Sequence, residues 1–158
     1  MAITTLEEMP ECRLGHAGSV LVSVWYSELT NRALDALEKH HLGLAERYGK
    51  ITMVSVVAGA NSNPSPEIRE RLKVQSVDMQ KKRHANLVVV ATRGLSAIIA
   101  RTFLAALSLL SSENMKVCSD FEDCAEAVRA VPGQDTEARA NTTFGPDLAA
   151  FVALPRPK

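Results

Sequence analysis

Residues 20–57 decide the fold, and they read VLVSVWYSELTNRALDALEKHHLGLAERYGKITMVSVV. An apolar run, Val20–Trp25, comes first, and a second apolar run, Ile51–Val57, ends the stretch. The residues between them repeat apolar positions at helical spacing, which predicts a helix over Asn31 to about Tyr48. Thr30 is a suitable N-cap for that helix. The stretch therefore predicts a strand–helix–strand unit.

The same alternation continues along the chain. Leu87–Ala91 and Met115–Cys118 are further apolar runs, and a helix-patterned stretch follows each of them. We therefore predict a single α/β domain over residues 11–133, in which helices pack on a sheet of roughly four or five mostly parallel strands. Cys12–Ala17 is expected to open the sheet as a hairpin with the strand that follows Gly18.

The segments on either side of this domain differ in composition. Residues 1–10 are expected to be a flexible lead, and residues 134–158 a polar flexible tail with a short apolar helix at Pro146–Leu154. The lead has neither the basic nor the apolar region of a signal peptide, and no apolar run approaches the ~20 residues that cross a bilayer. The 3 cysteines match no zinc or redox spacing, which favours buried thiols and a reducing cytoplasm.

The charge composition argues against two classes of partner. Lys+Arg and Asp+Glu both count 18, so the formal net charge is zero and neither nucleic acid nor an anionic membrane is favoured. A charge near zero also lowers self-repulsion, and we expect the chain to form a homodimer. The histidines and cysteines show no metal-ligand spacing, and nothing implies a cofactor. His41 falls within the apolar stripe of its helix and is predicted to be a core residue.

Three segments carry a family resemblance: VLVSVWYSELTNRALDAL (20–37), ANLVVVATRGLSAIIARTFLAALSLL (85–110) and KVCSDFEDCAEAV (116–128). Their order and lengths resemble the STAS domain, the fold of the anti-sigma-factor antagonists and of related small bacterial proteins. The resemblance implies a STAS-like fold and a regulatory or scaffolding role through protein–protein contacts, without catalysis.

In the antagonists, a phosphorylatable Ser or Thr lies in a loop of the Asp-x-Ser-Gly type. The loop at the corresponding place reads AGANSNPSPE (58–67), with Ser62 and Ser65 but neither an Asp nor a Ser-Gly pair. Both serines are candidate phosphorylation sites by position alone, so the family's switch cannot be carried over residue by residue.

A strand-to-helix turn offers an alternative function. Thr92, Arg93, Gly94 and Ser96 precede a helix-patterned stretch, where free backbone N–H groups and the helix dipole can hold an anion. A small-ligand or nucleotide-binding protein, similar to the universal stress proteins, would use this turn. That resemblance is the weaker one, because Trp25–Tyr26 stands where the family has an Asp and no further glycines follow the turn.

Two apolar elements are candidates for subunit contacts. Leu95–Leu110 is apolar on more than one side, which indicates a contact with a neighbouring helix or with another chain. Pro146–Leu154 would dock either on its own domain or on a neighbouring subunit. The candidate interface residues are Leu95, Ile99, Arg101, Phe103, Leu107 and Phe151.

Overall fold

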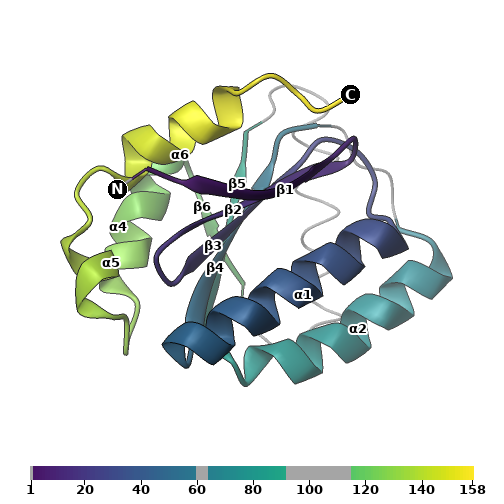
Figure 1. Ribbon diagram of the computed structural model, residues 1–158, viewed down its shortest axis with the longest axis horizontal. Coiled ribbons are helices and arrows are strands. Elements are labelled where there is room, and N and C mark those ends of the chain that lie inside the picture. Colours follow the sequence, from purple (N-terminus) through teal and green to yellow (C-terminus); the bar gives the residue numbers. More distant parts are fainter. Residues whose placement is uncertain (1, 60–63, 92–114) are drawn as a thin grey trace.

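The computed structural model describes residues 2–59, 64–91 and 115–158, which build one six-stranded sheet with helices on it (Figure 1). The strands are β1 (Thr4–Met9), β2 (Cys12–Ala17), β3 (Val20–Trp25), β4 (Ile51–Val57), β5 (Arg83–Val90) and β6 (Met115–Cys118). The helices of the described residues are α1 (Asn31–Tyr48), α2 (Pro66–Gln80), α4 (Phe121–Ala130), α5 (Thr136–Ala140) and α6 (Phe144–Ala153).

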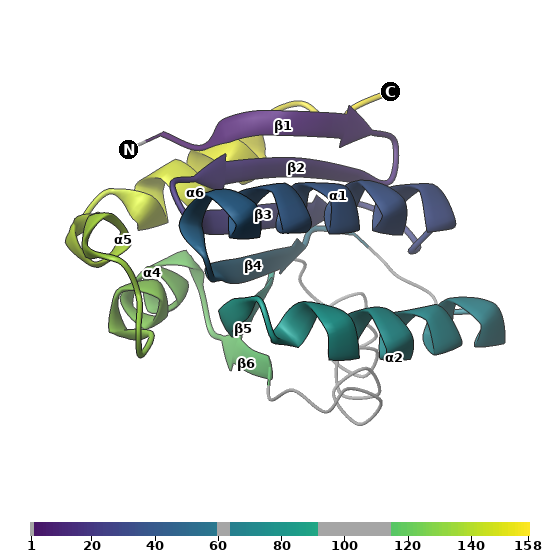
Figure 2. The same ribbon diagram turned by 60° about the horizontal axis from the view of Figure 1, so that its bottom comes forward.

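The strands lie in the sheet in the order of the chain, from β1 to β6 (Figure 2). β1 pairs with β2, and β2 with β3, in antiparallel directions. β3, β4, β5 and β6 pair in parallel, because a crossover joins each strand to the next. The α/β class is confirmed, but the sheet is larger and more mixed than the four or five mostly parallel strands that the sequence predicted.

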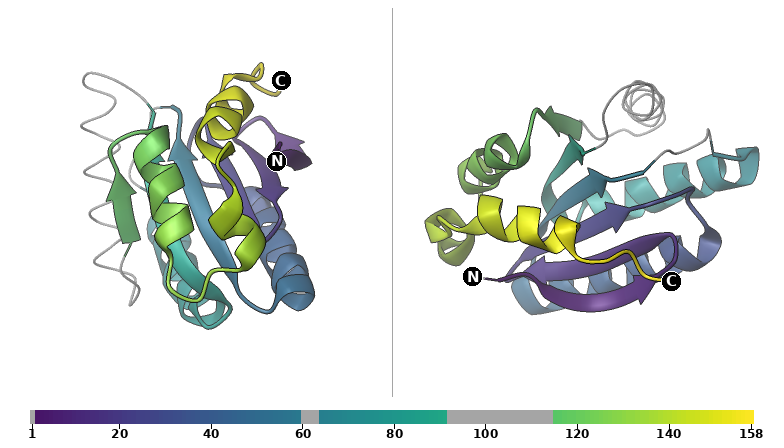
Figure 3. Two further views of the ribbon diagram at one scale, coloured as in Figure 1. Left: turned by 90° about the vertical axis from the view of Figure 1, so that its left-hand side faces the viewer. Right: turned by 90° about the horizontal axis from the view of Figure 1, so that it is seen from above.

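Helices cover both faces of this sheet. α1 and α2 pack on one face, and α4, α5 and α6 pack on the other (Figure 3). Alternate residues of β3 point to the two layers: Leu21 packs in the core cluster with α1, and Val22 packs in the cluster with α4 and α6. The residues of a central strand therefore build two separate apolar cores.

The two strands predicted to be buried lie inside the sheet. β4 has strands on both sides and is buried at every position except Ser55. β5 is paired on both sides as well, and Leu87, Val88 and Val89 are each at most 3% exposed. Their near-continuous apolar character is typical of strands covered on both faces.

The N-terminal segment is a strand rather than the expected flexible lead. Thr4–Met9 pairs with β2 from Thr4 opposite His16 to Met9 opposite Cys12. β1 lies at the edge of the sheet, its burial does not alternate along the strand, and only Met9 is buried. Backbone pairing to β2, rather than an apolar pattern of its own, holds this segment in place.

The C-terminal segment is likewise ordered rather than a flexible tail. α5 and α6 pack on the sheet, and Phe144, Leu148 and Phe151 are at most 3% exposed. The helix at the end of the chain was predicted to begin at Pro146, and it begins two residues earlier, at Phe144. Its apolar residues complete the core cluster that β3 and α4 begin.

Candidate functional site: the groove between α1 and α2

Most residues that the sequence singled out lie outside the described part of the chain. These are Ser62, the turn residues Thr92, Arg93, Gly94 and Ser96, and the helix residues Leu95, Ile99, Arg101, Phe103 and Leu107. Ser65 is described and exposed. Its Oγ accepts a hydrogen bond from the backbone N–H of Ile68 at 3.2 Å, so it is the N-cap of α2.

Phe151 was predicted to be an interface residue, and the structure buries it in its own domain at 3% exposure. Its ring lies 5.8 Å from the Cζ atom of Arg13, which stacks on it from β2. An aromatic side chain used in this way is not available to a second chain. Phe151 is therefore a core residue, contrary to the expectation from the sequence.

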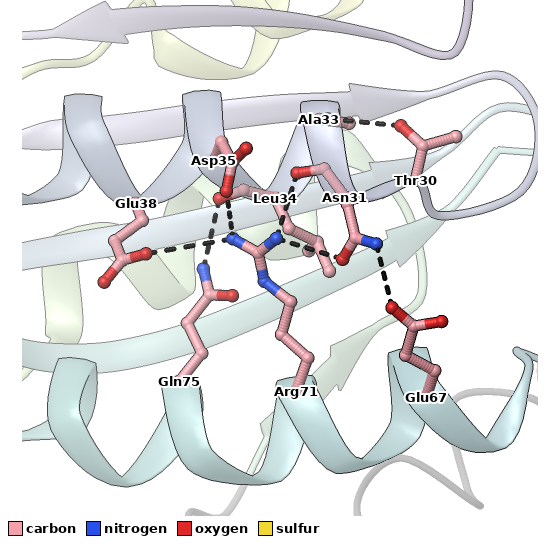
Figure 4. Close-up of polar contacts among 9 residues, drawn as sticks. All are labelled: Thr30, Asn31, Ala33, Leu34, Asp35, Glu38, Glu67, Arg71 and Gln75. Carbon is pink, nitrogen blue, oxygen red and sulfur yellow. Dashed lines mark hydrogen bonds and ion pairs between the residues drawn. The ribbon is translucent and has the colours of Figure 1, made fainter.

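The structure instead directs attention to the groove between α1 and α2, which lie side by side (Figure 4). At the N-terminal end of both helices, Asn31 Nδ2 donates to Glu67 Oε1 at 3.4 Å. One turn further along, Asp35 on α1 meets Arg71 on α2. The contacts advance along both helices in the same direction, so the two helices run parallel.

Arg71 is the main polar link between these helices. Its Nη1 donates to the backbone oxygen of Asn31 at 3.1 Å and to Asn31 Oδ1 at 3.0 Å. Its Nη2 donates to Asp35 Oδ1 at 2.5 Å and lies 3.9 Å from Glu38 Oε2. The guanidinium group is planar with several fixed donors, which suits it to hold several oxygen atoms at once. The positive charge of Arg71 is therefore paired with residues of α1.

Gln75 follows Arg71 by one turn and is only 8% exposed. Its Nε2 donates to the backbone oxygen of Leu34 at 3.3 Å, which fixes the orientation of the amide. Its Oε1 has no hydrogen-bond partner among the described residues. A buried amide oxygen of this kind costs free energy unless a donor reaches it.

Four of the seven residues that line the groove carry a carboxylate. The groove has a volume of about 510 Å³ and is lined by Glu38, Glu67, Glu70, Arg71, Val74, Gln75 and Asp78. Within the described ranges, Glu70 and Asp78 form no ion pair. Among the described residues, no ion pair neutralises their charge.

Exposed apolar side chains lie beside these carboxylates. Val74 is 57% exposed and Val77 is 43% exposed, and both lie on the outer side of α2. Leu42 of α1 is 39% exposed, and the parallel register places it level with Asp78. We call Leu42, Glu70, Val74, Val77, Asp78 and the groove beside them the α1–α2 face.

The chemistry of the α1–α2 face is set by the side chains that it presents. It offers carboxylate and amide acceptors and apolar surface, and it lacks cysteine, serine nucleophiles and histidine. Elsewhere, burial raises the pKa of the Cys12 thiol to about 12 and raises the pKa of Cys118 and Cys124, which disfavours reactive thiolates. No group of three His, Cys, Asp or Glu residues in the described part of the chain could hold a metal ion.

The sequence contained one signal for this site. Val74 and Val77 lie opposite the inner stripe of α2, which Ile68, Leu72 and Met79 form, and the helical spacing places them there. The sequence alone could not show that α1 lies beside α2, because Asp35, Glu38 and Leu42 precede the start of α2 by more than 20 residues. The groove exists only once the parallel sheet has placed both helices on one face.

The comparisons with known proteins identify no relative. No family model matches the chain, and neither a curated protein nor a solved structure matches it. Among the described residues, no helix combines the length and the apolar character that a membrane span requires.

Proposed function

We propose that this chain is a non-catalytic regulatory or scaffolding module with a STAS-like fold, which acts through contacts with another protein in a reducing cytoplasm. The α1–α2 face is the contact surface. The observation that carries the proposal is the position of exposed apolar residues: Leu42, Val74 and Val77 are three of the five large apolar side chains that the described residues expose.

Isolated apolar residues on a protein surface need no explanation, but a group of them beside a groove is typical of a binding surface. Val74 and Val77 lie one turn apart on α2, and the parallel register places Leu42 of α1 level with Asp78 of α2. The free thiols of Cys12, Cys118 and Cys124, all buried, fit a protein that works where disulfides do not form.

Site-specific photo-crosslinking in the cells that make the protein tests this function. A benzophenone amino acid at position 74 should give a covalent adduct with a partner protein of one defined mass. The matched control is position 126, because Glu126 is exposed on α4, on the opposite face of the sheet. Adducts of the same mass from both positions, or none from positions 74 and 77, would contradict a protein-binding role for this face.

A further inference from the structure

The groove between α1 and α2 has more negative charge than its own cation can balance. Four carboxylates line it, and Arg71 is the one cation in the lining. Arg71 is already held by Asn31, Asp35 and Glu38. By helical geometry, Arg69 and Lys73 project roughly 140° and 100° around α2 from Val74, so neither belongs to the groove.

The buried amide of Gln75 is a separate indication of what binds here. Figure 4 shows this amide between the two helices, with its oxygen on the side of Arg71. Gln75 lines the groove, and its buried amide oxygen has no donor among the described residues. A ligand that brings N–H donors would satisfy it, and a ligand that brings only acceptors would not.

The apolar residues restrict the ligand further. Val74 lies in the groove lining, between Glu70 and Asp78, which are each four residues away along α2. A partner that covers all three must present an apolar side chain with a positive charge on either side. Such alternation over successive helical turns is typical of an amphipathic segment.

Other classes of ligand fit these observations less well. Phosphate groups of nucleic acids or lipids would meet carboxylates at close range, which is repulsive. A metal ion would need ligands gathered at one point, and the described residues contain no such group. The remaining class is a protein segment that combines cationic and apolar side chains.

We propose that the α1–α2 groove binds a cationic amphipathic segment of a partner protein, with Lys or Arg side chains on Glu70, Asp78 and the Gln75 oxygen and apolar side chains on Val74 and Val77. This inference rests on the proposed function, since it specifies the chemistry of the partner.

Binding of designed peptides measures this specificity directly. The probe is a fluorescent Leu/Lys amphipathic helix as long as α2 (15 residues), and its counterpart carries Glu at every Lys position. The Lys peptide should bind saturably, its dissociation constant should rise with salt concentration, and amide shifts in NMR spectra should concentrate on α1 and α2. The Glu peptide should not bind.

Two variants with equal changes in net charge distinguish an effect of charges at the groove from an effect of the net charge of the whole protein. Glu70→Lys/Asp78→Lys should weaken binding of the Lys peptide by about tenfold and should create binding of the Glu peptide. Glu126→Lys/Glu137→Lys places the same charges on α4 and α5 and should leave both results as in the wild type. Circular dichroism of both variants establishes that they are folded.

Equal weakening by both variants, equal binding of both peptides, or no binding of the Lys peptide would each overturn the cationic specificity. An acidic or uncharged segment crosslinked to position 74 would also overturn it, while leaving the protein-binding function intact. If the Lys peptide binds but position 74 gives no crosslink in cells, the proposed protein-binding function is contradicted instead. Sedimentation of the protein alone tests whether a second copy of the chain occupies the groove. A wild-type dimer that dissociates in Glu70→Lys/Asp78→Lys would overturn the proposal that the occupant is a different protein.

Discussion

At the scale of single residues, two of the buried polar side chains lead to predictions about stability, and His41 is the first. It lies on α1, is fully buried, and neither ring nitrogen has a hydrogen-bond partner among the described residues. Burial lowers the pKa of His41 to about 4, and the positive charges of Arg83 and Lys82 act in the same direction. The imidazole is therefore neutral in the folded protein at neutral pH.

This burial predicts a loss of stability in mild acid. The unfolded chain takes up the His41 proton near pH 6.5 and the folded chain only near pH 4, so the free energy of unfolding should fall as the pH drops between these values. The fall from this group at pH 4.5 is about 2 to 3 kcal/mol. Urea unfolding of the wild type and of His41→Leu at pH 7.5 and 4.5 measures it. A loss of equal size in both proteins would show that other groups cause it.

Arg13 is the second buried polar residue, and it joins the two ends of the chain. It is 2% exposed on β2, and its Nη1 donates to the hydroxyl of Tyr26 at 2.8 Å. Nη1 also lies 3.4 Å from the backbone oxygen of Leu154, and Nε donates to Glu8 at 2.7 Å. One guanidinium group thus satisfies acceptors on β1, at the end of β3 and after α6.

Replacing Arg13 should therefore destabilise the fold and release the C-terminal segment. Arg13→Met keeps most of the side-chain volume but leaves the Tyr26 hydroxyl and several carbonyl oxygens without a donor, at a cost of about 2 to 4 kcal/mol. Arg69→Met, on the exposed side of α2, should change the free energy of unfolding by no more than about 0.5 kcal/mol. Urea unfolding measures the free energy of unfolding of both variants. Similar free energies for Arg13→Met and Arg69→Met would contradict the linking role of Arg13.

At the scale of elements, the sequence was informative wherever an element has its own pattern. β4 and β5 are continuous apolar runs, and α1 begins after Thr30, whose Oγ accepts from Ala33 N at 3.1 Å as a capping residue should. β1 has no such pattern, because an edge strand with polar side chains is defined by its neighbour rather than by its own residues. For the tail, the sequence predicted a short apolar helix but left open whether it docks on its own domain, since that docking depends on residues of β2 far away in the chain.

Gly15 shows how closely α6 approaches the sheet. A Cβ atom at this position would lie 2.6 Å from Phe151 Cζ and 2.9 Å from the backbone oxygen of Thr4. Gly15→Ala should therefore push α6 or β1 away and lower the free energy of unfolding by about 1 to 3 kcal/mol. Gly43, exposed in the middle of α1, has no atom within 4 Å of an added Cβ.

The matched variant Gly43→Ala should act in the opposite direction. Alanine favours the helical backbone over glycine by about 0.5 to 1 kcal/mol, and no contact opposes it here. In thermal unfolding, the midpoint of Gly15→Ala should lie below that of the wild type, and the midpoint of Gly43→Ala should lie above it. A stabilised Gly15→Ala protein would mean that α6 does not pack against β2 as closely as the structure has it.

At the scale of the whole molecule, the zero net charge conceals an uneven distribution. Among the described residues, Glu70 and Asp78 on the α1–α2 face form no ion pair, whereas Arg13 is buried on the other side of the sheet and paired with Glu8. Composition predicts only the sum of these charges and not where on the surface they lie. The site itself was not predictable, because it depends on two helices that the parallel sheet brings together.

The docked tail also narrows the ways in which two copies of the chain could associate. A homodimer through Pro146–Leu154 would need large apolar residues on the outside of α6, but Phe144, Leu148 and Phe151 are buried inside. Leu154 is the one large apolar side chain of this segment that is exposed, at 44%. Leu154→Asp should therefore leave the sedimentation coefficient unchanged at high micromolar concentration, whatever the oligomeric state of the wild type. The variant should also keep the unfolding midpoint, because Leu154 contacts Arg13 only through its backbone oxygen. A wild-type dimer that becomes a monomer in Leu154→Asp would instead make the end of α6 part of a subunit interface.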